Sequence, residues 1–209
     1  MRRYALLGSV AMLCACSNTV LVSVPPRMDL QKYPTLGIVE FASNSGRTIG
    51  ARAARQFQEQ IQAAQPGTRI VELGDRDTLL AELGGTQLDV AAFRKIGEKY
   101  GVAAVFLGEI AYSEPTVDVK VKDLTRLEGG VRAEVKGDIS SRLVETASGA
   151  SVWSRSAWAT RQIGSFQVSA EHGVSGGMKD SNPREAMLPA LAHQLTHDFR
   201  PTSERQPAR

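Results

Sequence analysis

The chain has 209 residues, of which 42% are hydrophobic and 22% are charged, and this composition indicates one globular domain with short extensions rather than two domains. A chain of this length is able to bury a core of its own. Its formal charge of +3 at pH 7 is too small to indicate nucleic acid as a partner.

The first fifteen residues have the pattern of a secretory signal. Arg2 and Arg3 precede an apolar run from Tyr4 to Leu13, which is far shorter than the roughly 20 residues that a membrane-spanning helix requires. We therefore expect residues 1–15 to be removed. The two arginines leave with them, so the formal charge of the mature chain falls to +1.

Small residues close this signal, and Leu13-Cys14-Ala15-Cys16 resembles the lipobox of bacterial lipoproteins. The resemblance implies cleavage between Ala15 and Cys16, a diacylglycerol on the Cys16 sulfur, and an acyl chain such as palmitate on the freed amine. Two or three acyl chains give stable membrane attachment, because each buried methylene contributes about 0.8 kcal/mol. No thiol then remains for a disulfide, a nucleophile or a metal site. The alternative is an ordinary secretory signal cut near the same place.

The first half of the mature chain combines strand and helix patterns. Residues 16–34 are predicted to be a lipidated tether stiffened by prolines, with Val20–Val22 as an alternative edge strand. A buried strand follows at Leu36–Phe41, and apolar residues then recur every four positions in a helix that Pro66 ends. The next predicted elements are a strand at 68–73, a helix capped by Asp75 or Asp77, a helix capped by Asp89, and a central strand at 102–110.

The second half changes to an alternating pattern. Val117, Val119 and Val121 alternate with charged residues, which places one face of a strand on the core, and residues 131–143 do the same over a longer stretch. The turn at 146–149 leads to a returning strand over 151–161. Residues 164–182 are predicted to be a loop, a final helix begins near Pro183 and stops at Pro201, and residues 201–209 are predicted to be a disordered tail.

This order of elements predicts an α/β (α+β) domain over residues 35–200. We expect a mixed β-sheet with a long antiparallel meander and with helices mainly on one face. The returning strand carries two tryptophans, Trp153 and Trp158, which fall on opposite pleats because they are five residues apart. One of them is expected to pack in the core, and the other is either partly buried or exposed as a contact for a protein or a glycan.

Four stretches together resemble the CsgG-like envelope lipoproteins, which include the penicillin-binding-protein activator lipoproteins: Gly37–Phe41 with the turn at 44–46, Ile96–Ile110, the hairpin at 146–154, and Gly176-Gly177. The resemblance implies an anticodon-binding-domain-like fold. It also implies a non-catalytic outer-membrane lipoprotein that faces the periplasm, without cofactor, and serves as a binding or assembly module for envelope proteins or cell-wall polymer in secretion, export or cell-wall synthesis. A homo-oligomer is compatible with it, and an oligomeric secretion or export ring is the alternative.

A hydrolase is a further alternative from a different class. Residues 173–177 match the Gly-x-Ser-x-Gly pattern around Ser175, and His193, His197, Asp180 and Asp198 lie downstream. A nucleophile elbow needs a strand running into the serine and a helix leaving it, whereas the residues after Ser175 are polar and resemble a loop. We therefore expect a flexible connector and no catalytic residues.

Two further motifs favour ordinary structural roles. His193-Gln194-Leu195-Thr196-His197 differs from a zinc-protease motif in the residue that serves as general base, and both histidines fall on the predicted solvent face of the last helix. No metal site is expected there. Gly46-Arg47-Thr48 at a helix start suggests phosphate binding, but the preferred interpretation is a turn in which Ser45 or Thr48 caps the helix.

Overall fold

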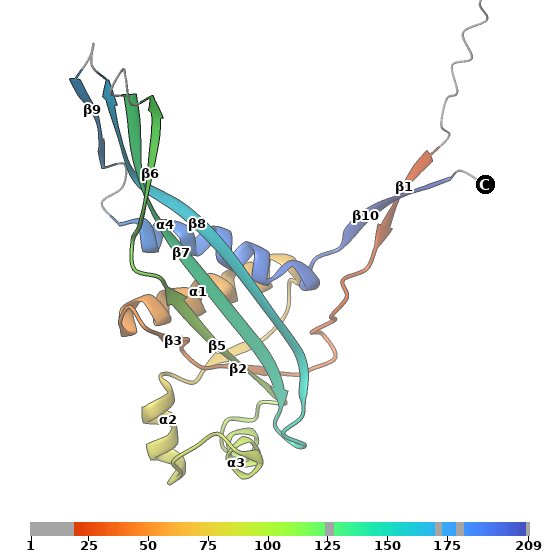
Figure 1. Cartoon of the computed structure of the whole chain (residues 1–209). Helices are drawn as coiled ribbons and strands as arrows, with labels where there is room; N and C mark the ends of the chain where they lie inside the picture. The colour runs from red at the N-terminus through yellow and green to blue at the C-terminus, as the bar shows by residue number, and fades with distance from the viewer. Residues whose placement is uncertain (1–18, 124–127, 170–172, 179–181, 208–209) are drawn as a thin grey trace, which may run out of the picture.

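The computed structural model describes residues 19–123, 128–169, 173–178 and 182–207, and it confirms the predicted fold class, a mixed β-sheet with helices packed against it (Figure 1). None of the described helices is both long and apolar enough to cross a bilayer. In chain order the elements are β1 (Thr19–Val24), β2 (Leu36–Ile38), β3 (Ala42–Ser43), α1 (Arg47–Ala64), β4 (Ile70–Glu72), α2 (Arg76–Leu83), α3 (Val90–Tyr100), β5 (Ala104–Tyr112), β6 (Thr116–Asp123), β7 (Glu128–Glu145), β8 (Ser151–Ser169), β9 (Gly173–Met178), α4 (Pro183–Leu195), the short 3₁₀ helix η1 (His197–Phe199) and β10 (Thr202–Pro207).

The main sheet has the strand order β4-β2-β5-β7-β8-β9, with β3 paired to β5 and β6 paired to β7. Strand β2 pairs in parallel with both β4 and β5, whereas β5, β7, β8 and β9 pair antiparallel in succession. Strand β5 thus lies inside the sheet, which confirms the central strand predicted at 102–110. The meander that follows is dominated by the long hairpin of β7 and β8, which have 18 and 19 residues.

Helices α1 and α4 cover one face of the sheet and enclose an aromatic core. The ring centroids of Phe57 on α1 and Phe106 on β5 lie 5.2 Å apart, and Phe199 lies 6.0 Å from Phe106. Trp153 on β8 completes this group at 4.7 Å from Phe199. The prediction that one tryptophan packs in the core is therefore confirmed.

Helices α2 and α3 close a second, smaller apolar cluster on the opposite face of the sheet. Val105 on β5 belongs to it together with Phe93 and Ile96 of α3, because successive side chains of a strand point to opposite faces. The predicted caps are confirmed, since Asp75 and Asp89 accept hydrogen bonds from the first turns of α2 and α3. Beyond these two helices, the same face over β5, β7 and β8 carries no described helix (Figure 1).

The strands β6 and β9 and the adjoining ends of β7 and β8 form an arm that projects beyond the helices (Figure 1). The prediction that Val117 and Val119 face the core is wrong, because each is 62% exposed. Their partners on β7 are Ala133 and Val131, which lie past the last position that α4 covers. The predicted loop at 164–182 is also wrong, because β8 continues to Ser169 and β9 pairs with it.

The two ends of the described chain also differ from expectation. Strand β1 pairs antiparallel with β10, from Thr19 opposite Pro207 to Val24 opposite Thr202, so the residues expected to be a disordered tail form a strand. The alternative strand at Val20–Val22 exists, but it joins β10 rather than the main sheet. The predicted tether is ordered from Thr19 onwards, and backbone pairing between the two ends supplies the order that their sequences do not indicate. We call β1 and β10 the terminal ribbon.

Candidate functional site

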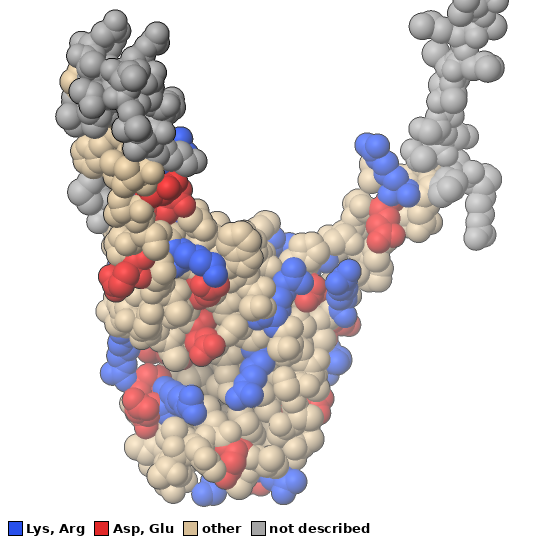
Figure 2. Space-filling view, in the orientation of Figure 1, with Lys and Arg blue, Asp and Glu red and all other residues tan. Residues whose placement is uncertain are grey.

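An open groove of about 1030 Å³ lies on the face of the sheet opposite α1 and α4. Strands β5, β7 and β8 form its floor, and β3 and the first turn of α2 form its walls. Figure 2 shows basic and acidic side chains interspersed over the visible face of the molecule, without a field of one sign. The groove is hydroxyl-rich, and the serines that line it are Ser43, Ser140, Ser141, Ser154 and Ser156.

Strand register arranges the floor of the groove in rows. Glu109 on β5 pairs with Ser140 on β7, which pairs in turn with Ser156 on β8, and paired residues point to the same face. Within this row the Ser140 hydroxyl donates to a carboxylate oxygen of Glu109 at 3.3 Å. The next row pairs Arg142 with Ser154. The floor thus offers donors and acceptors side by side on rigid strands.

An ion pair between Arg47 and Asp75 joins the start of α1 to the start of α2 at the rim. The Asp75 carboxylate also accepts hydrogen bonds from the Thr78 hydroxyl at 2.6 Å and the Thr78 backbone N–H at 3.0 Å. These bonds, helped by Arg47, hold the pKa of Asp75 well below its usual range. Asp75 is therefore a weak base and a structural cap.

The glycine motif at the start of α1 is placed at the same rim. Gly46 is the N-cap residue with a φ of 100°, and no side chain caps the helix, so the predicted cap by Ser45 or Thr48 is wrong. The Ser45 hydroxyl instead donates to the side-chain oxygen of Asn44 at 3.1 Å. Arg47 is held by Asp75, which leaves the motif no phosphate site of its own.

Trp158 extends the polar floor along β8. It is 62% exposed and lies two residues beyond Ser156, on the same face of the strand. Its partner across the strands is Asp138, and the Lys136 ammonium lies 5.8 Å from the centroid of its ring. The predicted opposite placement of the two tryptophans is thus confirmed, and the exposed indole adds a flat apolar surface to the polar rows.

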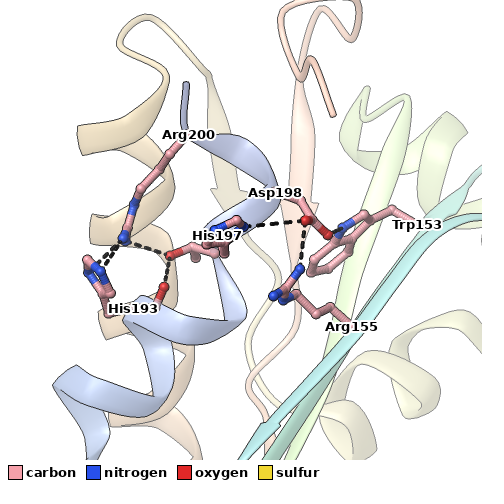
Figure 3. A network of polar contacts seen from close by, with 7 residues as sticks. Trp153, Arg155, His193, His197, Asp198 and Arg200 are labelled. Atoms are coloured by element: carbon pink, nitrogen blue, oxygen red, sulfur yellow. Dashed lines mark hydrogen bonds and ion pairs between the residues drawn. The ribbon is translucent and has the colours of Figure 1, made fainter. Parts of the chain in front are cut away.

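A separate network of polar contacts fixes the end of α4 against β8 (Figure 3). Asp198 accepts hydrogen bonds from Arg155 at 2.6 Å and from the Trp153 indole N–H at 3.2 Å, and His197 lies 3.7 Å away. Burial raises the pKa of Asp198, but the two hydrogen bonds outweigh it and the net pKa is lowered. Asp198 is thus committed to Arg155 and does not face Ser175.

His193 belongs to the other half of this network. The Arg200 guanidinium lies 2.6 Å from its nearer ring nitrogen and donates to Gln60 and Thr196, at 2.6 Å and 2.8 Å (Figure 3). His193 and His197 are both exposed, which confirms the predicted solvent face. Among the described residues, no group of three or more potential metal ligands occurs.

Ser175 lies within β9 rather than at a turn into a helix. It is exposed and pairs with Gln167 of β8 in the middle of an antiparallel ladder. The expected flexible connector is therefore a strand, and its geometry is not that of a nucleophile elbow. Asp180, Ala15 and Cys16 lie outside the described residues.

The groove is what the sequence interpretation missed. Asp138 and Arg142 were correctly assigned to the water-facing side of β7, but a water-facing strand is usual on antiparallel sheets and does not by itself indicate a site. The available signal was the serine at alternate positions of two neighbouring strands, Ser140, Ser154 and Ser156. Strand register turns that alternation into a surface.

Comparison with known proteins gives structural likeness only. No model of a known protein family matches the chain, and no curated protein matches it significantly. The PelC dodecamer of Paraburkholderia phytofirmans is 12% identical, with a TM-score of 0.43 and coverage of 86% of this chain and 96% of that chain. Lipoprotein GNA1162 of Neisseria meningitidis is 15% identical (TM-score 0.36; 78% and 97% covered), and the LpoB C-terminal domain of Escherichia coli is 12% identical (TM-score 0.35; 64% and 88% covered).

Proposed function

We propose that this protein is a non-catalytic lipoprotein of the bacterial outer membrane, facing the periplasm, whose groove binds another envelope component. The groove carries this proposal. It is open and polar, and none of the described residues that line it is a histidine, cysteine or lysine. A serine nucleophile needs a base that takes its proton, and the low pKa of Asp75 makes that carboxylate a poor one. Such a surface is suited to binding.

The attachment rests on the sequence at Cys16. A signal over residues 1–15, cleavage between Ala15 and Cys16, and acylation of Cys16 would place the domain next to the lipid. The proposed boundaries are a tether over residues 16–34, a domain over 35–200 and a tail over 201–209. Because β1 and β10 pair with each other, the tether and the tail act as one unit.

The chemistry of the groove supports an envelope protein or cell-wall polymer as partner. Serine hydroxyls beside Glu109 and Arg142 offer hydrogen bonds in both directions, and the exposed Trp158 offers a flat face for a sugar ring or an aromatic side chain. Basic and acidic groups are mixed, so the surface does not attract a nucleic acid (Figure 2).

Site-specific crosslinking in the native envelope tests this role. A photoreactive amino acid at Ser156, on the groove floor, is expected to capture a defined envelope component. The matched control places it at Glu59, an exposed residue of α1, which covers the other face of the sheet. Equal capture at both positions, or none at Ser156, would contradict the proposal. Mass spectrometry of the mature N-terminus tests the anchor separately, since an unmodified Cys16 would refute it.

A second candidate function, an oligomeric export or secretion ring, is favoured by the arm. One face of the arm carries an apolar stripe, whose members are Val117, Val119, Val131, Ala133 and Phe166. Phe166 is 42% exposed and both valines of β6 are 62% exposed, which is typical of a protein contact. Light scattering of the mature protein distinguishes the two: a ring gives a multiple of the chain mass that the Val117→Ser change lowers, and an adaptor gives a monomer.

A further inference from the structure

The terminal ribbon stands away from the body as a pair of strands (Figure 1). Six residue pairs hold it together, from Thr19 opposite Pro207 to Val24 opposite Thr202. A two-stranded ribbon by itself is only marginally stable in water and normally rests on another surface. Among the described residues, the main sheet does not include either strand. The ribbon therefore needs a surface from outside the chain.

The exposed side chains of the ribbon indicate an apolar surface. Val20 is 50% exposed, Leu21 is 69% exposed and Val22 is 36% exposed. Because they are consecutive residues of a strand, they present apolar groups on both faces of the ribbon. A contiguous exposed apolar segment of this kind is typical of a contact with a protein or a membrane.

The distance to Cys16 decides between these surfaces, and this step rests on the proposed function. Thr19 follows Cys16 by three residues, which span at most about 11 Å when fully extended. If acyl chains on Cys16 enter the bilayer, the first residues of β1 lie at the level of the lipid head groups. We propose that the terminal ribbon rests on the lipid surface at the boundary between head groups and acyl chains, with Val20 and Leu21 in contact with lipid.

Backbone chemistry limits how deep the ribbon lies. Each of its two strands has one edge without a partner strand among the described residues, and unpaired backbone groups are too costly for the hydrocarbon interior. At the boundary, water and head groups pair with those edges. Arg205 is the partner of Leu21 and lies on the same face, so its guanidinium is placed to bind a lipid phosphate while the leucine enters the acyl region.

Tryptophan reporters on the acylated protein test the contact. The protein is purified from membranes of its native host and placed in phosphatidylethanolamine and phosphatidylglycerol vesicles, with or without brominated acyl chains. Leu21→Trp is the reporter, and Val20→Trp is a second one for the other face. The matched control is Val90→Trp on α3, which is 45% exposed and lies at the end of the body away from the ribbon (Figure 1).

We expect brominated lipid to reduce the added fluorescence of the ribbon reporters about twofold and to leave the Val90→Trp signal unchanged. Absence of quenching at both ribbon positions, in a sample whose Cys16 carries lipid by mass spectrometry, overturns the inference and leaves the proposed function intact. A blue-shifted emission without quenching indicates that a second copy covers the ribbon, and it overturns the inference as well. An unacylated Cys16 overturns the proposed function and, with it, the inference.

Discussion

The side-chain amide of Gln65 donates a hydrogen bond to the carbonyl oxygen of Met28 at 2.7 Å. The same amide group donates to the carbonyl oxygen of Phe199 at 3.1 Å, and the amide oxygen accepts from the Leu30 N–H at 2.8 Å. Gln65 ends α1 and is only 5% exposed. One buried side chain thus joins the segment that enters the domain to the segment that leaves it, just before both continue into the terminal ribbon.

Replacing this amide is expected to destabilise the fold strongly. Gln65→Leu leaves the Leu30 N–H and the carbonyl groups of Met28 and Phe199 without these partners, and each buried unpaired group costs about 1–3 kcal/mol. We expect the free energy of unfolding to fall by about 2–4 kcal/mol in urea titrations, since part of the loss is relieved by water. Gln31→Leu, at an exposed residue with one 3.5 Å bond, is the control and is expected to change it by less than about 0.5 kcal/mol.

The elements that the sequence predicted well are those with local signals. In α1 the apolar residues recur at the helical period, and Phe57 lies fully buried as that period requires. In α3 the cap is equally local, since Asp89 accepts from the Ala92 N–H at 2.8 Å and Gly101 ends the helix with a φ of 66°. Such features depend on residues a few positions apart, so the sequence alone contains them.

The arm, the ribbon and the groove depend on contacts between distant residues. The glycines that suggested a loop near position 176 are required by pairing, because a Cβ on Gly176 would lie 2.1 Å from the carbonyl oxygen of Ser165 on β8. Likewise, nothing near Thr19 indicates that its partner is Pro207. Whether a face of an alternating strand is covered depends on where α2, α3 and α4 end, which no period in the strand itself reports.

Asp198 predicts how stability depends on pH. Its pKa in the folded protein is lowered because the hydrogen bonds from Arg155 and Trp153 outweigh the effect of burial. A lowered folded-state pKa adds stability above the ordinary pKa of about 4, and that stability is lost as the pH falls through the folded-state value. Asp198→Asn is therefore expected to be less stable than the parent near neutral pH, and the difference should shrink towards about pH 2.

Urea midpoints measured across this range check the effect. Asp138→Asn is the control, because Asp138 forms an exposed ion pair with Lys136 at 3.1 Å and exposed pairs contribute little. We expect that control to track the parent protein at every pH. A difference between Asp198→Asn and the parent that stays constant as the pH falls would show that the carboxylate charge is not what the network uses.

Ser175 is expected to be unreactive. A serine nucleophile needs a base within hydrogen-bond reach, whereas Ser175 is exposed in the middle of β9 and His193 contacts Arg200 towards the far end of α4 (Figure 1). A fluorophosphonate probe is therefore expected to label the parent protein no more than the Ser175→Ala variant, as judged by intact mass. A stoichiometric adduct on Ser175 would restore the hydrolase alternative.

Gly50 gives a test of packing against helix propensity. It lies inside α1, where alanine is favoured over glycine by about 1 kcal/mol, so propensity alone predicts that Gly50→Ala is stabilising. A Cβ at this position would lie 1.9 Å from the carbonyl oxygen of Phe41, which is backbone and unable to rotate away. Helix α1 would have to move off β3, and overpacking of this kind costs about 1–3 kcal/mol or more.

We therefore expect Gly50→Ala to lower the free energy of unfolding by about 1–2 kcal/mol net of the propensity gain. Gly85→Ala is the matched control, because the nearest atom to its added Cβ would be 3.9 Å away. Urea titration of both variants decides between the two terms. If Gly50→Ala proved as stable as Gly85→Ala, the close approach of α1 to Phe41 would not hold, and with it the packing that brings Arg47 to the rim of the groove.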